Sequence, residues 1–446
     1  MADGSERVEL AVKGDYRSAF KSRDFRLYQT ARLMVILGAE AQSVAVAWQV
    51  YALTHSALDL GYTGLALFLP GLFVMLAAGH AADRFDRRKI ILLCYGLQAV
   101  CTATLLWLSM SATALKGGRI WPIYAVLVGI GLGRAFSGPA ASAMLPSLVP
   151  KEHFVNAVTW GATVYQIANM SGPAVGGILF TLPLAGAVAV WNGAPVVYAF
   201  TLTMLMGFIV LVGMIRAKMV KTEKKAFSVK TVLAGLEYVW RAKLLLGSIS
   251  LDLFAVLLGG ATALLPIFAT DILHAGPRGL GLLRAMPSVG ALAVSLTMVA
   301  RPIERRAGAT MLVCVGIFGA ATVVFGVSKS IWLSCGVLVI VGASDMVSVV
   351  VRSSLLQLAT PPEMRGRVSA VNWLFIGASN EFGEFESGLT AHWWGAVRAV
   401  VIGGVASMVV TASAAGLFPQ LRRADALTAE SLMGAERELS MAEPVN

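Results

Sequence analysis

The chain has 446 residues, of which 57% are hydrophobic and only 14% are charged, and its formal net charge is +11. Soluble domains carry about a quarter charged residues, so this composition excludes a soluble globular protein and predicts an integral membrane protein. The positive charge does not indicate a nucleic-acid partner, because the cations lie in short clusters between apolar stretches rather than on one polar domain.

Residues 1–28 form the first predicted part of the chain. They are too charged for a cleaved signal peptide, so we expect a cytoplasmic N-terminal segment. Twelve apolar segments follow, and each is long enough to cross the hydrocarbon core of a bilayer, which needs about 20 residues. The predicted spans are 30–54, 58–82, 89–114, 120–147, 153–180, 186–215, 244–272, 278–300, 309–328, 331–358, 367–391 and 396–418.

The longest polar connection lies between the sixth and seventh spans and divides the chain into two halves of six spans. We expect it to contain a short amphipathic helix at the membrane surface. The predicted fold is therefore all-α, with twelve transmembrane helices in two pseudo-symmetric six-helix halves. The predicted parts are the cytoplasmic N-terminal segment 1–28, the N-terminal half 29–215, the cytoplasmic central loop 216–243, the C-terminal half 244–418 and the cytoplasmic tail 419–446.

The distribution of lysine and arginine predicts the orientation of the chain. With the N-terminus inside, the cytoplasmic segments hold 27 of these residues and the outer connections hold five. Positive residues concentrate on the cytoplasmic side of membrane proteins. We therefore predict a multi-pass plasma-membrane protein, of a bacterial inner membrane, with both termini in the cytoplasm.

The two halves resemble each other in sequence. VNAVTW, which begins at Val155, has a counterpart in VSAVNW, which begins at Val368, and GLALFLP at 64–70 aligns with GLLRAMP at 281–287. A duplicated six-span unit is typical of secondary transporters, which bind substrate between the repeats near the membrane midplane.

The connection after the second span reads GHAADRFDRRK, at 79–89. A simple cationic anchor accounts for its basic residues, but not for a glycine at the end of a span or for an acid near the hydrocarbon edge. The stretch resembles the signature loop of the major facilitator superfamily, G-x-L-a-D-r-x-G-r-k, from which Ala81 and Asp86 depart. The matching residues are Gly79, Asp83, Arg84, Arg87 and Arg88. The resemblance implies that this loop is a gating latch between the halves.

Two further motifs extend this resemblance over essentially the whole chain. Arg134 precedes Gly138 by four residues, as in the R-x-x-x-G motif of the family, and SGPAVGG resembles the G-P-x-x-G-G motif of proton-coupled antiporters. The residues of that second motif, in which the proline is expected to bend the helix, are Gly172, Pro173, Gly176 and Gly177. Glycine and proline are also ordinary in membrane helices, which leaves a purely structural alternative. FIGASNEFGEFESG and FPQLRR resemble a bacterial branch that contains enterobactin and drug exporters.

Ionisable residues at bilayer depth are costly and are therefore candidates for function. Glu40 in the first span and Arg134 in the fourth are both expected near the midplane, as a pair that opens on protonation or substrate binding. Asp345 and Arg352 lie two turns apart on one face of the tenth span, and Asp252 lies in the seventh span, nearer the cytoplasm. The alternative is that such pairs are only structural.

The eleventh span carries three carboxylates within NEFGEFES. Glu381 and Glu384 share a face, whereas Glu386 points elsewhere. Three carboxylates in hydrocarbon must gain a proton, pair with a cation or face water, so we predict a role in proton relay. The alternative is a structural role between helices or at an outer vestibule.

These features predict a proton-driven exporter, most simply an antiporter, that works by alternating access. The resemblance implies a siderophore or an amphipathic drug-like cargo; the arginines suit an anion, the carboxylates suit a cation, and the choice stays open. The alternatives are an uptake symporter or lysophospholipid flippase of the same fold and, remotely, a membrane-embedded enzyme, for which no catalytic motif is present. We expect a monomer that needs protons, lipid and a small-molecule substrate, with no cofactor, no metal and no nucleic acid.

Overall fold

The computed structural model describes residues 18–111, 115, 119–182, 193–216, 229–300 and 306–424, and within these ranges it contains helices and no strands. The long helices are α2 (Arg23–Thr54), α3 (Ala57–Arg84), α4 (Arg87–Met110), α5 (Trp121–Met144), α6 (Phe154–Leu179), α7 (Ala194–Gly213), α9 (Lys243–Leu258), α11 (Gly276–Ala300), α12 (Ala307–Val327), α13 (Ile331–Leu358), α14 (Pro362–Trp394) and α15 (Ala396–Leu417). The predicted all-helical class is confirmed, and each predicted span coincides with one of these helices.

Ten of these segments are both long and apolar enough to cross a membrane; one of them continues from α9 through the short helices η6 (Ala261–Leu264), α10 (Leu265–Ile267) and η7 (Phe268–Ile272). The other two, α6 and α14, have 26 and 33 residues but are less apolar. In α14 the reason is the three predicted carboxylates. All twelve predicted spans therefore correspond to segments that are long enough to cross a membrane, and ten of these segments are also apolar enough.

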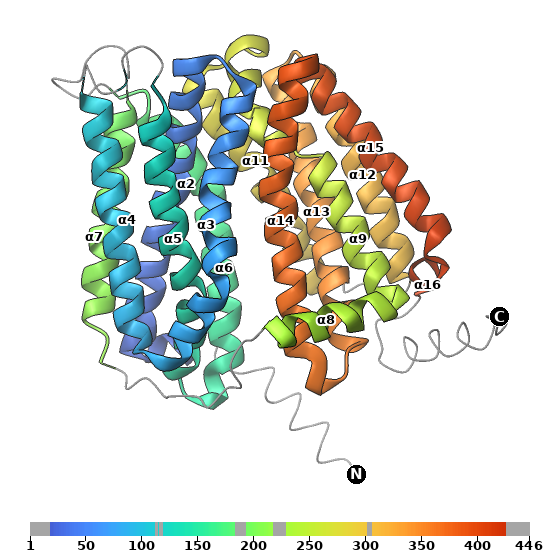
Figure 1. The fold of residues 1–446 in the computed structure, drawn as a ribbon, viewed down its shortest axis with the longest axis horizontal. Helices are drawn as coiled ribbons and strands as arrows, with labels where there is room; N and C mark the ends of the chain where they lie inside the picture. The colour runs from blue at the N-terminus through green and yellow to red at the C-terminus, as the bar shows by residue number, and fades with distance from the viewer. Residues whose placement is uncertain are drawn as a thin grey trace.

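The helices form two groups side by side, α2–α7 and α9–α15 (Figure 1). We call the end at which α2 begins the lower end and the end at which α2 meets α3 the upper end, as in Figure 1. The helix α8 (Val229–Arg241) crosses the lower end and packs against α14. It lies in the central connection, where a short amphipathic helix was predicted.

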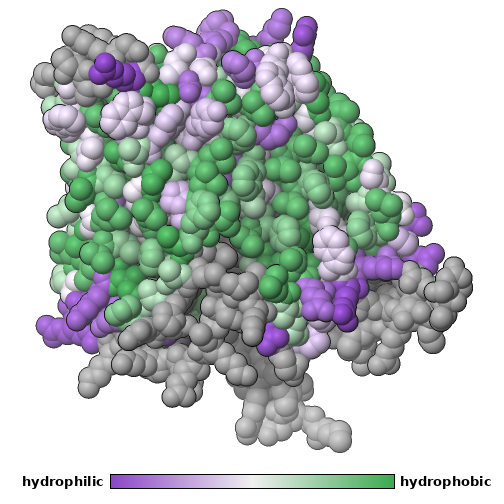
Figure 2. Space-filling view, in the orientation of Figure 1, coloured by the Kyte–Doolittle hydropathy of each residue, from purple (hydrophilic) through white to green (hydrophobic). Residues whose placement is uncertain are grey.

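The outer surface is that of a membrane-embedded bundle. Figure 2 shows a band of hydrophobic side chains across the middle of the molecule, between more polar ends. Tryptophan gathers at the boundary between hydrocarbon and water, because its ring is apolar and its N–H is polar. The exposed tryptophans near the upper ends of their helices are Trp107, Trp121, Trp332, Trp393 and Trp394.

The two groups contact each other closely toward the upper end, along α3 with α14 and along α6 with α11. A Cβ added to Gly61 would lie 3.1 Å from the Cα of Phe385, and one added to Gly281 would lie 2.8 Å from the Cα of Gly177. Small residues permit this approach of two backbones in a membrane. Hydrogen bonds across the groups reinforce it, because the Tyr51 hydroxyl donates to Asp271, and Arg278 Nε donates to Thr181 Oγ1 at 3.1 Å.

Replacing Gly281 with Val should open the upper end, because a side chain there collides with the backbone of α6. We expect a longer distance, by double electron–electron resonance, between spin labels at positions 119 and 329 of a variant without the four native cysteines. The control is Gly96→Val, since a Cβ at Gly96 meets nothing within 4 Å. An unchanged distance in Gly281→Val would contradict the role assigned to this contact.

Candidate functional site

The seven charged residues predicted to line a cavity separate into two clusters in space. The central cluster holds Glu40 of α2, Arg134 of α5, and Glu381 and Glu384 of α14; the cluster inside the second helix group holds Asp252 of α9, and Asp345 and Arg352 of α13. The first joins residues from both helix groups, whereas the second joins α9 to α13 only.

The carboxylates of α14 lie against α3 at the contact between the groups. A Cβ on Gly64 would lie 2.9 Å from Glu384 Oε2 and 3.2 Å from Glu381 Oε2. Glu381 and Glu384 are three residues apart, which places them on one helix face, as predicted. The absent side chain of Gly64 therefore leaves the space that both carboxylates occupy.

The charges of the central cluster act on one another from four helices. Glu381 interacts electrostatically with Glu384, Arg134 and Arg284, and Glu384 interacts with Arg284 and Glu40. No ion pair within 4.0 Å joins these residues in the described part of the chain. Three carboxylates facing two guanidiniums carry an excess negative charge, and a bound proton would remove it at bilayer depth.

The direct pair predicted between Glu40 and Arg134 is not formed among the described residues. Glu40 instead packs against α6, where a Cβ added to Gly172 would lie 2.4 Å from the Cβ of Glu40. Arg134 is exposed and is attracted by Glu381 of the other helix group. Sequence spacing gives the depth of a residue on each helix but not the direction in which its side chain points.

The glycines of SGPAVGG pack α6 against two neighbours. Gly172 and Gly176 face Glu40 and Ala41 of α2, while Gly177 faces Gly281 of α11. Pro173 lies inside the continuous helix α6. In this structure the motif therefore brings α6 close to a charged residue of its own group and to the backbone of the other group.

Arg284 belongs to the central cluster but was not predicted. It lies on α11, and its Nη1 donates to the carbonyl oxygen of Ser43 on α2 at 3.1 Å, which is a contact across the two groups. Its signal in the sequence was a charged residue within an apolar span, in GLLRAMP, where the aligned residue of the first half is Leu67.

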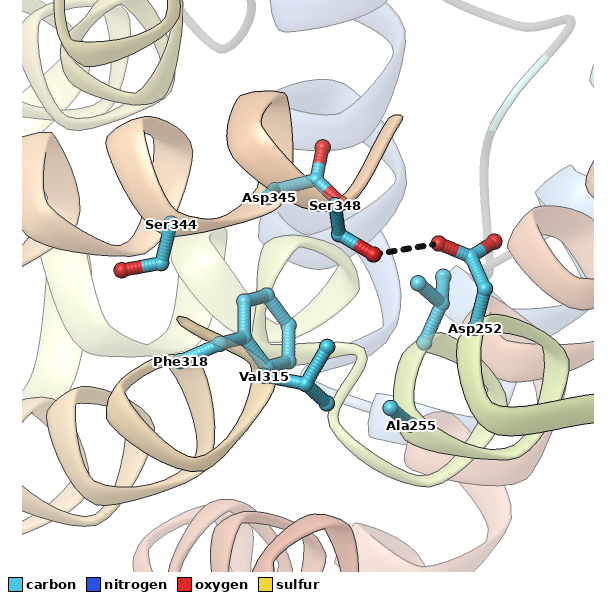
Figure 3. A pocket seen from close by; sticks show the side chains of 8 residues that line it. Asp252, Ala255, Val315, Phe318, Ser344, Asp345 and Ser348 are labelled. Atoms are coloured by element: carbon cyan, nitrogen blue, oxygen red, sulfur yellow. Dashed lines mark hydrogen bonds between the residues drawn. The ribbon is translucent and has the colours of Figure 1, made fainter. Parts of the chain in front are cut away.

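The second cluster is closed within its own helix group. Arg352 forms an ion pair with Asp252, and their side chains are only 3% and 6% exposed. Ser348 Oγ donates to Asp252 Oδ1 at 3.5 Å, and Asp345 interacts electrostatically with both charged partners. Figure 3 shows Asp252, Asp345, Ser344 and Ser348 around a small cavity, which has room for about one water molecule. The Asp252–Arg352 pair is therefore balanced, and Asp345 adds a second carboxylate to the same cluster within the second helix group.

The loop at 79–89 is described in part. The helix α3 passes through Gly79, Asp83 and Arg84, and the side chains of Asp83 and Arg84 lie outside the described part of the structure. Asp86, which departs from the family pattern, caps α4 by accepting a hydrogen bond from the backbone N–H of Arg88 at 2.9 Å. The Arg88 guanidinium donates to the carbonyl oxygen of Gly213 at the end of α7, and Arg87 is buried.

This fold and this charged interface define the class of the protein, a secondary transporter of the major facilitator type. Residues 17–444 match the family described as transmembrane secretion effector, and the chain belongs to that family. The chain is therefore a multi-pass membrane transporter and not an enzyme.

Named relatives and solved structures agree with this class. The chain is 27% identical over 400 residues to the enterobactin exporter EntS of Citrobacter koseri, and 27% identical over 402 residues to that of Shigella dysenteriae, with 88% of each chain covered. Its fold is similar to that of a bacterial homologue of the iron transporter ferroportin in an inward-facing state, with a TM-score of 0.67, 13% identity, and 90% and 98% of the two chains covered. It is also similar to a D-xylose–proton symporter, with a TM-score of 0.66, 13% identity, and 89% and 98% covered.

Removing one partner of the buried Asp252–Arg352 pair should destabilise the protein, because the other charge is left buried alone. Such a change costs about 3–5 kcal/mol. We expect Arg352→Gln to lower the midpoint of thermal unfolding, and the double variant Asp252→Asn with Arg352→Gln to recover part of the loss. Arg398→Gln, at an exposed position, is the control. Equal midpoints for the control and Arg352→Gln would refute the assignment.

Proposed function

We propose that this protein is a proton-coupled antiporter that exports a small amphipathic molecule by alternating access, as a monomer. The observation that carries the proposal is the pair Glu381 and Glu384, which lies at the contact between the helix groups without an ion-pair partner among the described residues. Carboxylates in this position gain a proton at low cost when the site is closed to water and lose it when water enters.

The direction of export follows from orientation and family. Lysine and arginine are concentrated at the lower end, so this end faces the cytoplasm in our proposal, with both termini there. The close contacts near the upper end then correspond to a state that is closed to the outside. Because relatives are named enterobactin exporters, we propose a siderophore or a similar amphipathic compound as cargo.

The proposed cycle uses residues from both groups. In the state with the upper end closed, cargo enters from the lower end and the central carboxylates release their proton. Separation of α3 from α14 and of α6 from α11 then exposes the site to the other side, where cargo leaves and a proton returns. In this proposal the loop with Asp83 and Arg87 acts as the latch at the lower end.

Purified protein in liposomes with a trapped pH-sensitive dye tests the proposal. A proton gradient is imposed, and catecholates, hydroxamates, cationic drugs and lysolipids are added in turn. We expect one class to move protons in the direction opposite to cargo, and Glu381→Gln and Glu384→Gln to reduce this movement to the background of empty liposomes. Glu152→Gln, at an exposed position, is the control and should transport as wild type does.

Other outcomes would decide between the alternatives. Protons that move in the same direction as cargo would indicate an uptake symporter. Labelled lysolipid that crosses at the same rate in wild type and in Glu381→Gln would indicate an uncoupled flippase, and the carboxylates would then be structural.

A further inference from the structure

Two arginines without a carboxylate partner lie at a similar depth in the first helix group. Arg32 is nine residues above the lower end of α2 and Arg134 is ten residues above the lower end of α5, which is about 14 and 15 Å. Neither forms an ion pair within 4.0 Å with a carboxylate of the described chain. Both interact electrostatically with the phenol of Tyr95 on α4, which lies between α2 and α5 in this interaction.

Buried amides accompany these two cations. Gln29 lies one turn before Arg32, is 2% exposed, and has no hydrogen-bond partner for either polar atom of its side chain. A Cβ added to Gly161 of α6 would lie 2.8 Å from Arg32 Nη1 and 3.5 Å from Gln29 Nε2, so both side chains face the same glycine. Buried polar groups are almost always satisfied, and an unsatisfied one requires an explanation.

A second buried amide lies between α4 and α5. Gln98, one turn after Tyr95 on α4, is 7% exposed, and its Nε2 has no hydrogen-bond partner. It lies beside the residue that precedes Arg134, because a Cβ added to Gly133 would be 3.3 Å from Gln98 Nε2. The two guanidiniums and the two amide NH2 groups offer many donors and few acceptors. This composition matches a ligand that is rich in acceptors and negatively charged.

The position of Arg134 shows how such a ligand would reach the site. Its side chain is exposed and is attracted by Glu381 of α14, so it faces the other helix group. Arg32 is partly exposed. Arg32 has no carboxylate within 4.0 Å among the described residues, and an anion that binds between the two arginines would be attracted by both guanidiniums.

We propose that Arg32 and Arg134 form a binding site for an oxyanion group of the transported molecule, a carboxylate or a chemically similar planar anion. A guanidinium presents paired N–H donors that match such a group, and the amides of Gln29 and Gln98 supply further donors. The identification of this anion as cargo rests on the proposed function, whereas the binding of an anion at this site is independent of that function. Such a site favours an anionic cargo over a cationic one, a choice that the sequence left open.

Three dansyl probes that share one fluorophore test the site on the purified full-length protein in nanodiscs, in a buffer with chloride, which is not an oxyanion, as the only added anion. Dansylglycine is anionic, dansylamide is neutral and dansylcadaverine is cationic. We expect dansylglycine to bind about tenfold more tightly than dansylamide, and Arg32→Gln and Arg134→Gln each to remove that preference. Arg398→Gln, an exposed arginine, is the matched control and should retain it.

Further variants separate recognition from folding. Gln29→Leu removes an amide without changing the charge. We expect it to weaken the binding of dansylglycine severalfold and to leave the affinity for dansylamide unchanged. A purely structural role of the arginines would lower the midpoint of thermal unfolding without changing the ratio of the two affinities. Equal binding of the three probes by wild type, or an anion preference that survives both arginine variants, would overturn the proposal.

Glu381→Gln separates this proposal from the proposed function. It should keep or increase the affinity for dansylglycine, because it removes a negative charge that attracts Arg134, although it is expected to lose proton movement. Loss of the anion preference in Glu381→Gln would contradict the site. Proton-coupled transport in a wild type that shows no anion preference would overturn the anion site and leave the proposed function standing.

Discussion

The need to balance each charge inside the hydrocarbon layer governs the interior of this protein. Asp252 and Arg352 achieve the balance locally, as a buried ion pair within one helix group. Other charges act between the groups: Arg284 of α11 reaches the backbone of α2, and Glu381 of α14 is attracted by Arg134 of α5. Charges that are satisfied only across a movable contact become unsatisfied when that contact moves, so separation of the two helix groups changes the electrostatic environment of these side chains.

Close backbone contacts make this shared balance possible. Glycine at positions 61 and 64 brings α3 against α14, and glycine at 177 and 281 brings α6 against α11. Contacts without side chains depend on van der Waals packing, which favours a small number of well-fitted arrangements rather than a continuous range. The carboxylates of α14 lie beside one of these contacts, so any separation of α3 from α14 would change the solvent and the charges that surround them.

Hydropathy was enough to predict the helices, whose observed ends lie within a few residues of the predicted ones for segments such as 331–358. The spacing of Glu381 and Glu384 also predicted a shared face correctly. The partners of these charges were beyond prediction, because spans that are apolar nearly all round show no periodicity that indicates which face meets which helix. Arg32 and Arg284 were not predicted, because a single cation within an apolar span carries no sequence pattern that indicates its partners in the folded structure.

An anionic cargo places a condition on coupling. A negative group bound at Arg134 weakens the attraction of that arginine for Glu381 and thereby favours a proton on the carboxylate, so direct electrostatics makes anion and proton bind together. Antiport requires instead that the proton and cargo do not bind at the same time. In such an antiporter the conformational equilibrium must separate them, because cargo favours the state that is closed at the upper end and the proton favours the state that is open there. The membrane potential assists such an exporter, because each negative charge that leaves a negative-inside cell gains about 2.3 kcal/mol per 100 mV. For the proposed antiport, the contact near Gly64, rather than the arginine site, is therefore where binding of the proton and binding of cargo would exclude one another.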